Sequence, residues 1–248
     1  MATYRSDSDL EFLSKCSNED LGLLVSILTV DPKDGNERHT QTLTGTTEYL
    51  FNRENPQVYW HLIAAELQTF GAHSGMTLLR GRRGVLYREI LIDVCKKVKA
   101  NIDKNVAIET IEHALLMSVL KKSLEKMSKD ELQNLATELG CISAKITPSI
   151  LMMSIQSSIM TNPTMWNFMT LTILQQLGFN VGKLVLSAGT TFVPRTLPIF
   201  GLLTGPIGWT ISGLWLVSDI AGPAYRVTVP ACFYVAALRQ KYMVANTK

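Results

Sequence analysis

The uneven distribution of charge along the chain is the feature that most limits its fold. Residues 1–144 hold 17 basic and 20 acidic side chains, which gives this part a net charge of −3. Residues 145–248 hold seven basic side chains and one acidic one, for a net charge of +6, and residues 146–182 contain no charged side chain. Apolar segments of this length must be covered by protein or by lipid. The sequence therefore predicts an acidic, charged front half and a cationic, apolar back half.

Apolar residues recur with helical spacing along most of the chain, which predicts an all-α fold. Ser8 and Glu11 have the spacing of a helix capping box, and the pattern repeats at Ser17. The apolar stripe in "SNEDLGLLVSILTV" has the spacing i, i+3, i+4, i+7. Two short amphipathic helices joined tightly, over residues 1–30, are therefore expected as an N-terminal helical hairpin.

Start and stop signals divide the rest of the chain into a charged helical domain over 31–144 and an apolar, glycine-rich helical region over 145–248. The loop from 31 to 56 is expected to contain one helical turn near residues 46–51. Helices are expected over 85–98 and 106–126, and further helices after Ser128 and from Asn55-Pro56, Pro148 and Pro163. A final helix is expected in "VPACFYVAALRQKYM", and "YRVTV" is the only strand-like stretch.

The segment from Gly201 to Ala231 raises the question of membrane insertion. Its uncharged part, residues 196–218, would span about 35 Å as a helix, against about 30 Å for the hydrocarbon core of a bilayer. Two prolines and a central tryptophan argue against one straight span. The closely spaced small residues favour tight helix pairing. Membrane insertion, a dry core and a groove for an apolar partner all remain open. The candidate packing or membrane residues are Gly201, Gly205, Gly208, Trp209, Gly213 and Trp215.

A glycine-punctuated arginine turn, "LLRGRRGVLYRE", is the candidate anion-binding site. It contains Arg80, Arg82, Arg83 and Arg88. Arginine forks suit phosphate or carboxylate groups, and glycines free the backbone to approach them. The competing interpretation is a solvated turn whose arginines pair with Glu66, Glu89 or Asp93.

No motif points to catalysis. The spacing of His61 and Glu66 does not fit a zinc-binding helix, and no phosphate-binding loop, nucleophile elbow or dinucleotide fingerprint is present. The four cysteines are far apart and form no CxxC pair, which favours a reduced, cytosolic compartment. The N-terminus lacks a secretory signal pattern, and the acidic front half argues against a nucleic-acid partner. We expect a non-enzymatic protein without a metal or a cofactor.

Three stretches carry a resemblance to a known family. They are "DSDLEFLSKCSNEDL", "LIAAELQTFGAHSG…LRGRRGVLYREILIDVCKKVK" and "GPIGWTISGLWLVSDIAGPAYRVTVPA". Together they resemble the YaaW family of bacterial proteins over most of the length. That family is grouped at a distance with ubiquinol–cytochrome c chaperones, and the resemblance implies an assembly or holding role for a membrane or apolar client.

We therefore expect a cytoplasmic protein at the inner face of the bacterial inner membrane, bound peripherally or inserted. Its partners would be an anionic lipid surface or an apolar protein client, and an oligomer is compatible with the sequence. The alternative is a membrane-permeabilising effector of stress or defence, with a glycine-rich hydrophobic hairpin.

Overall fold

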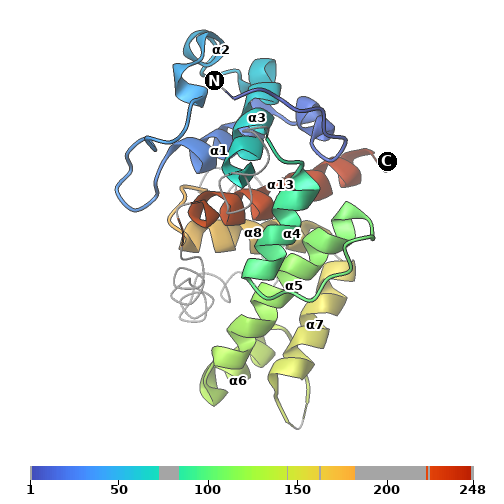
Figure 1. The fold of residues 1–248 in the computed structure, drawn as a ribbon. Coiled ribbons are helices and arrows are strands. Elements are labelled where there is room, and N and C mark those ends of the chain that lie inside the picture. The colour runs from blue at the N-terminus through green and yellow to red at the C-terminus, as the bar shows by residue number, and fades with distance from the viewer. Residues whose placement is uncertain are drawn as a thin grey trace.

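The computed structural model describes residues 2–72, 84–143, 145–161, 163–181, 222 and 224–246, and over these ranges the chain is all-α. The 3-10 helices (η) and α-helices are η1 (Glu11–Lys15), α1 (Asn18–Thr29), η2 (Leu43–Gly45), α2 (Thr47–Phe51), η3 (Pro56–Tyr59), α3 (Trp60–Ala72), α4 (Tyr87–Lys97), α5 (Ile108–Lys126), α6 (Lys129–Glu138), α7 (Pro148–Thr161), α8 (Pro163–Gln176) and α13 (Tyr225–Asn246). Their arrangement is shown in Figure 1. The expected all-α class is confirmed.

The N-terminal pair of helices differs in part from the expectation. Ser17 caps α1 as predicted, because its side chain accepts a hydrogen bond from the backbone N–H of Asp20. The first element, however, is a five-residue 3-10 helix that follows Leu10 and has no side-chain cap, so the capping box predicted at Ser8 is wrong. Phe12 and Leu13 of η1 are buried, which shows that packing holds this short element in place.

Local signals located most of the other helix starts correctly. Thr46 caps α2 through the backbone N–H of Tyr49. Ser128 and Glu131 form a reciprocal capping box at the start of α6. Three helices begin with a proline, at Pro56, Pro148 and Pro163. The first N–H of a helix has no acceptor within the helix, so its absence in proline costs nothing there.

Helix α13 runs through the middle of the fold (Figure 1). It contacts η1, α1, α3, α4, α5 and α8, and every residue from 227 to 239 is buried. The strand-like stretch "YRVTV" is helical and forms the first five residues of α13. Burial on all sides makes β-branched residues acceptable in a helix despite their propensity. Pro230 lies inside the helix, so one backbone hydrogen bond is missing there.

A buried ion pair fixes α13 to α5. The Nε of Arg239 donates to both carboxylate oxygens of Glu112, at 3.1 Å each, and the side chains are 7% and 1% exposed. The Tyr87 hydroxyl donates to Glu112 at 2.9 Å. The Arg239 guanidinium also lies 4.5 Å from the ring centre of Phe12 and donates through Nη2 to the Asp9 carbonyl. Burial raises the pKa of Glu112 to about 7, and the adjacent guanidinium opposes this rise.

A second contact fixes α13 to α1. Lys241 Nζ lies 2.8 Å from both carboxylate oxygens of Asp20. The hydroxyl of Tyr234 donates to the backbone carbonyl of the same aspartate at 3.0 Å. These contacts join residues more than 200 positions apart in the sequence. Helix α13, from the apolar half, is thus fixed to helices of the charged front half, and it also packs against α8.

No helix in the described part of the chain has both the length and the apolar character that crossing a bilayer requires. All six residues proposed between 201 and 215, and the arginines at 80, 82 and 83, lie outside the described residues.

Candidate functional site

The turn that follows α1 builds the first wall of a small pocket. The Asp31 carboxylate accepts a hydrogen bond from the backbone N–H of Lys33 at 3.0 Å, and its own N–H donates to the Asn36 carbonyl at 2.9 Å. Gly35 takes a positive φ of 72°, which a side chain would oppose. The chain then returns antiparallel to itself, and the N–H of Arg38 donates to the Thr29 carbonyl at 2.7 Å.

The other walls come from the end of α8 and the start of α13. Gly178 turns the chain after α8 with a φ of 93°, and it packs so closely that a Cβ there would lie 3.1 Å from Pro32. This turn positions Leu177 and the buried Phe179. Arg226 and Pro230 project from the first two turns of α13.

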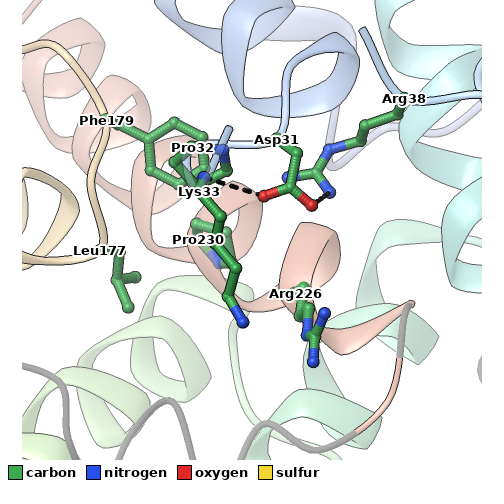
Figure 2. A pocket seen from close by; sticks show the side chains of 8 residues that line it. All are labelled: Asp31, Pro32, Lys33, Arg38, Leu177, Phe179, Arg226 and Pro230. Carbon is green, nitrogen blue, oxygen red and sulfur yellow. Dashed lines mark hydrogen bonds and ion pairs between the residues drawn. The ribbon is translucent and has the colours of Figure 1, made fainter. Parts of the chain in front are cut away.

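The pocket that these segments enclose has a volume of about 50 Å³. It is lined by Asp31, Pro32, Lys33, Arg38, Leu177, Phe179, Arg226 and Pro230. Figure 2 shows the Arg38 guanidinium beside the Asp31 carboxylate, and in this view the Lys33 and Arg226 side chains both extend downward. Four of the lining residues are apolar, three are cationic and one is an aspartate, so the lining carries a net charge of +2.

Arg38 is the unusual member of this pocket. Its side chain is only 8% exposed, and the ion pair that it forms among the described residues, from Nη1 to Asp31 Oδ2, is long at 3.4 Å. Its Nε and Nη2 are buried and have no hydrogen-bond partner among the described residues. Burial lowers the pKa of Arg38, the nearby Arg226 lowers it further, and Asp31 opposes this change. A buried donor without an acceptor costs about 1–3 kcal/mol, and more when it is charged. The arrangement therefore favours an added anionic acceptor.

A wider hollow of about 830 Å³ adjoins the pocket. Asp31, Arg38 and Arg226 line both spaces, so they form the wall between them. The hollow also has Asp34 and Glu37 on its lining, which makes it less cationic than the pocket. An anion should therefore bind better in the small pocket than in the wider hollow.

The lining offers binding groups and no evident catalytic ones. Among the residues that the structure describes, the lining contains no serine, threonine, cysteine or histidine. Its one carboxylate, on Asp31, is engaged by the turn and by Arg38. Within the described ranges, no group of three or more His, Cys, Asp or Glu side chains is arranged to hold a metal ion.

Of the arginines predicted to bind an anion, the structure describes Arg88. Its Nη1 donates to the carbonyl oxygens of Lys104, at 3.2 Å, and Val106, at 2.8 Å, and its Nε lies 3.7 Å from an Asp9 carboxylate oxygen. These contacts hold the loop before α5 against the start of α4. Glu66, one expected partner of the arginine turn, accepts hydrogen bonds from the backbone N–H and the hydroxyl of Thr42.

The sequence reasoning did not identify the Arg38 pocket. The turn "DPKDGNER" was recognised only as a loop, although it carries two cations that follow turn-forming residues. The second available signal was Arg226, an isolated charge that follows a long segment poor in charged residues.

Comparison with known proteins places the chain in a family. A family described as a domain of unknown function (DUF3944) matches residues 4–39, which include the turn with Asp31 and Arg38. A "UPF0174 protein" of Helicobacter pylori strain J99 is 40% identical over 98% of this chain and 95% of its own length. "UPF0174 protein YaaW" of Escherichia coli K12 is 32% identical over 99% and 98% of the two chains. The chain belongs to the UPF0174 (YaaW) family.

The resemblance to YaaW proteins that the sequence motifs suggested is thereby confirmed. No solved structure matches this UPF0174 chain. The names of the relatives state no activity, so any function must be argued from the site.

Proposed function

We propose that this UPF0174 protein is a non-enzymatic binding protein that associates with an anionic membrane surface through the Arg38 pocket. The observation that carries the proposal is the buried Arg38 guanidinium, two of whose three nitrogens, Nε and Nη2, have no acceptor in the described part of the chain. An anionic headgroup would supply that acceptor. The cationic, apolar back half of the sequence suits the same surface.

The exposed cations at the pocket allow the expected change in membrane affinity to be calculated. Lys33 and Arg226 are both exposed and form no ion pair among the described residues. A basic side chain near an anionic membrane contributes about 1 kcal/mol of binding free energy. Each of the two should therefore change vesicle affinity about fivefold at low salt.

Vesicle flotation tests the proposal directly. The intact protein should float with vesicles containing phosphatidylglycerol and not with pure phosphatidylcholine vesicles, and salt should weaken the binding. The double variant Lys33→Gln, Arg226→Gln should bind roughly 30-fold more weakly. The matched control Lys121→Gln, Lys129→Gln removes two exposed cations outside the pocket and should bind like the wild type. Equal losses in both double variants would show that only net charge matters and would refute the assigned site.

The same vesicles distinguish a membrane-binding protein from a membrane-permeabilising effector. Loaded with a self-quenching dye, they should bind the protein without releasing the dye. Release of dye at protein concentrations that saturate binding would favour the effector instead.

A chaperone-like role is a second candidate, supported by exposed apolar side chains on α2 and η3. Phe51 is 83% exposed, and Leu50 and Val58 are 53% and 52% exposed. Side chains of this size gathered on adjacent elements are typical of protein-binding surfaces. A protein that binds no vesicles, yet suppresses aggregation of a heat-denatured reporter enzyme only while Phe51 is intact, would favour this second function.

A further inference from the structure

The Arg38 pocket combines two surfaces that a simple phosphate site does not need. Part of its lining is cationic, from Lys33, Arg38 and Arg226, and another part is apolar. The apolar side consists of Pro32, Leu177, Phe179 and Pro230. A free inorganic anion would gain nothing from the apolar wall, because that wall can only remove water from it. An occupant that carries both a charge and an apolar part uses both sides.

The backbone at the start of α13 does not form a phosphate cradle. Phosphate sites at helix N-termini use unpaired backbone N–H groups. Here the N–H of Arg226 donates to the Gly222 carbonyl, and those of Val227 and Thr228 both donate to the Ala224 carbonyl. With these donors occupied, recognition of an anion depends on side chains, chiefly on the guanidinium of Arg38.

The unpaired edge of that guanidinium matches a carboxylate. Nε and Nη2 lie on one side of the planar group, and their two parallel N–H bonds fit the two oxygens of a carboxylate. Both nitrogens are buried, so a ligand reaches them when the guanidinium turns toward the pocket, and the ion pair to Asp31, long at 3.4 Å, opposes that turn only weakly. The pocket volume of about 50 Å³ admits a small head and the carbon atoms next to it, and it leaves a longer chain outside.

We infer that the pocket binds the carboxylate of a fatty acid, with the guanidinium of Arg38 on the carboxylate and the Leu177–Phe179 wall on the first methylene groups. This inference rests on the proposed membrane association and names the ligand of the same site. The source would be the lipid surface itself, since a free fatty acid presents its carboxylate at the interface while its chain stays among the lipids.

Calorimetry with four small probes tests each part of the inference on the full chain. Octanoate should bind at least tenfold more tightly than acetate, which lacks the chain, and than 1-octanol, which lacks the charge. It should also bind more tightly than octyl phosphate, whose bulkier and more highly charged head costs more to desolvate in a pocket of about 50 Å³. If acetate bound as tightly as octanoate, the apolar wall would have no role in binding. If octanol bound as tightly, the ion pair with Arg38 would have no role. Tighter binding of octyl phosphate would overturn the carboxylate as the preferred head.

Variants assign the binding to the pocket. Arg38→Gln should weaken octanoate binding at least tenfold and leave octanol binding unchanged, and Arg38→Lys should not restore it because a lysine lacks the fork. Leu177→Ala should weaken octanoate and spare acetate. The control Arg53→Gln removes an exposed arginine outside the lining and should change nothing. Octanoate affinity unchanged in a folded Arg38→Gln protein would refute the site.

Folding is monitored separately by thermal denaturation without ligand. Arg38→Gln should keep or raise the melting temperature, because it removes a buried charge that has one long ion pair and two nitrogens without a partner among the described residues. A C-terminal apolar peptide with a free carboxylate provides a further arm: tighter binding of this peptide than of octanoate would replace the fatty acid by a protein client. If vesicles bind but octanoate does not, only this inference fails. If octanoate binds but vesicles do not, the membrane association fails.

Discussion

Replacing Arg239 by methionine should destabilise the fold, and the loss should depend on pH. The arginine is buried with Glu112, and its Nε contacts both carboxylate oxygens at 3.1 Å. Methionine fills much of the same space without a charge. The substitution therefore leaves the Glu112 carboxyl at 1% exposure with the Tyr87 hydroxyl as its remaining hydrogen-bond partner among the contacts described above.

The size of the loss follows from the contacts that disappear. Breaking a buried ion pair from one side costs about 3–5 kcal/mol. The contact over Phe12 and the hydrogen bond to the Asp9 carbonyl are lost as well. For a chain of 248 residues, 1 kcal/mol corresponds to a shift of roughly 2–4 °C in melting temperature. The variant should therefore melt about 6–20 °C below the wild type at about pH 8.5.

The pH dependence follows from Glu112. The fold raises its pKa to about 7 from an ordinary value of 4.5, so the folded protein holds this proton more tightly than the unfolded chain. Stability therefore falls as the pH rises from 4.5 toward 7, in the wild type and in the variant alike. Above about pH 7 the wild type ionises Glu112 beside its arginine, whereas the variant must keep it protonated. The deficit of the variant should thus grow by about 2 kcal/mol between pH 7 and 8.5.

Thermal and urea denaturation at about pH 6 and pH 8.5 would measure this. Arg239→Lys keeps the charge and should show a smaller deficit that changes little with pH. Lys121→Met breaks only an exposed pair with Glu125 at 3.9 Å and should cost at most about 0.5 kcal/mol. A deficit for Arg239→Met that matches Lys121→Met, or that shrinks toward high pH, would refute the buried ion pair as the element that fixes α13.

Two further predictions use matched positions. Gly71→Ala should destabilise the fold by about 1–3 kcal/mol, because the added Cβ would lie 2.4 Å from a side-chain carbon of Ile90. Gly22→Ala should stabilise it by roughly 0.5–1 kcal/mol, because Gly22 lies within α1 and a Cβ there would meet nothing within 4 Å. Equal effects of the two substitutions in urea denaturation would contradict the packing. Burial raises the pKa of the three buried cysteine thiols, and it raises that of Cys16 to about 12. Iodoacetamide at about pH 8 should therefore alkylate the native protein first at the half-buried Cys141. If mass spectrometry found Cys16 modified as fast as Cys141, the core would open readily.

Helix starts could be predicted because their causes are local. Ser17 and Ser128 cap their helices through the residue three positions later, and proline at a first helical position needs no distant partner. The failures had non-local causes. The first element became a 3-10 helix because Phe12 and Leu13 pack against the core. The β-branched start of α13 is helical because it is buried among other helices.

The candidate site could not be predicted, because no single segment contains it. Arg38, Phe179 and Arg226 come from three separate parts of the sequence, and only their packing leaves two guanidinium nitrogens without a partner in the described part of the chain. The arginine turn was conspicuous in the sequence because its charges are adjacent, and the one arginine described there, Arg88, serves to hold a loop. The pairing of Glu112 with Arg239 spans 127 positions and likewise leaves no local signal.

The central position of α13 has a consequence for biosynthesis. The ribosome makes residues 225–246 well after α1–α8, yet α13 packs between α1, α3, α4, α5 and α8 and is buried from residue 227 to 239. At roughly 5–20 residues per second, the earlier helices wait several seconds or more with their inner faces uncovered. Contacts between residues as far apart as 9 and 239 also make the closing step slow. A nascent chain of this protein should thus be an early client of ribosome-associated chaperones, and one stalled before residue 225 should be degraded rather than folded.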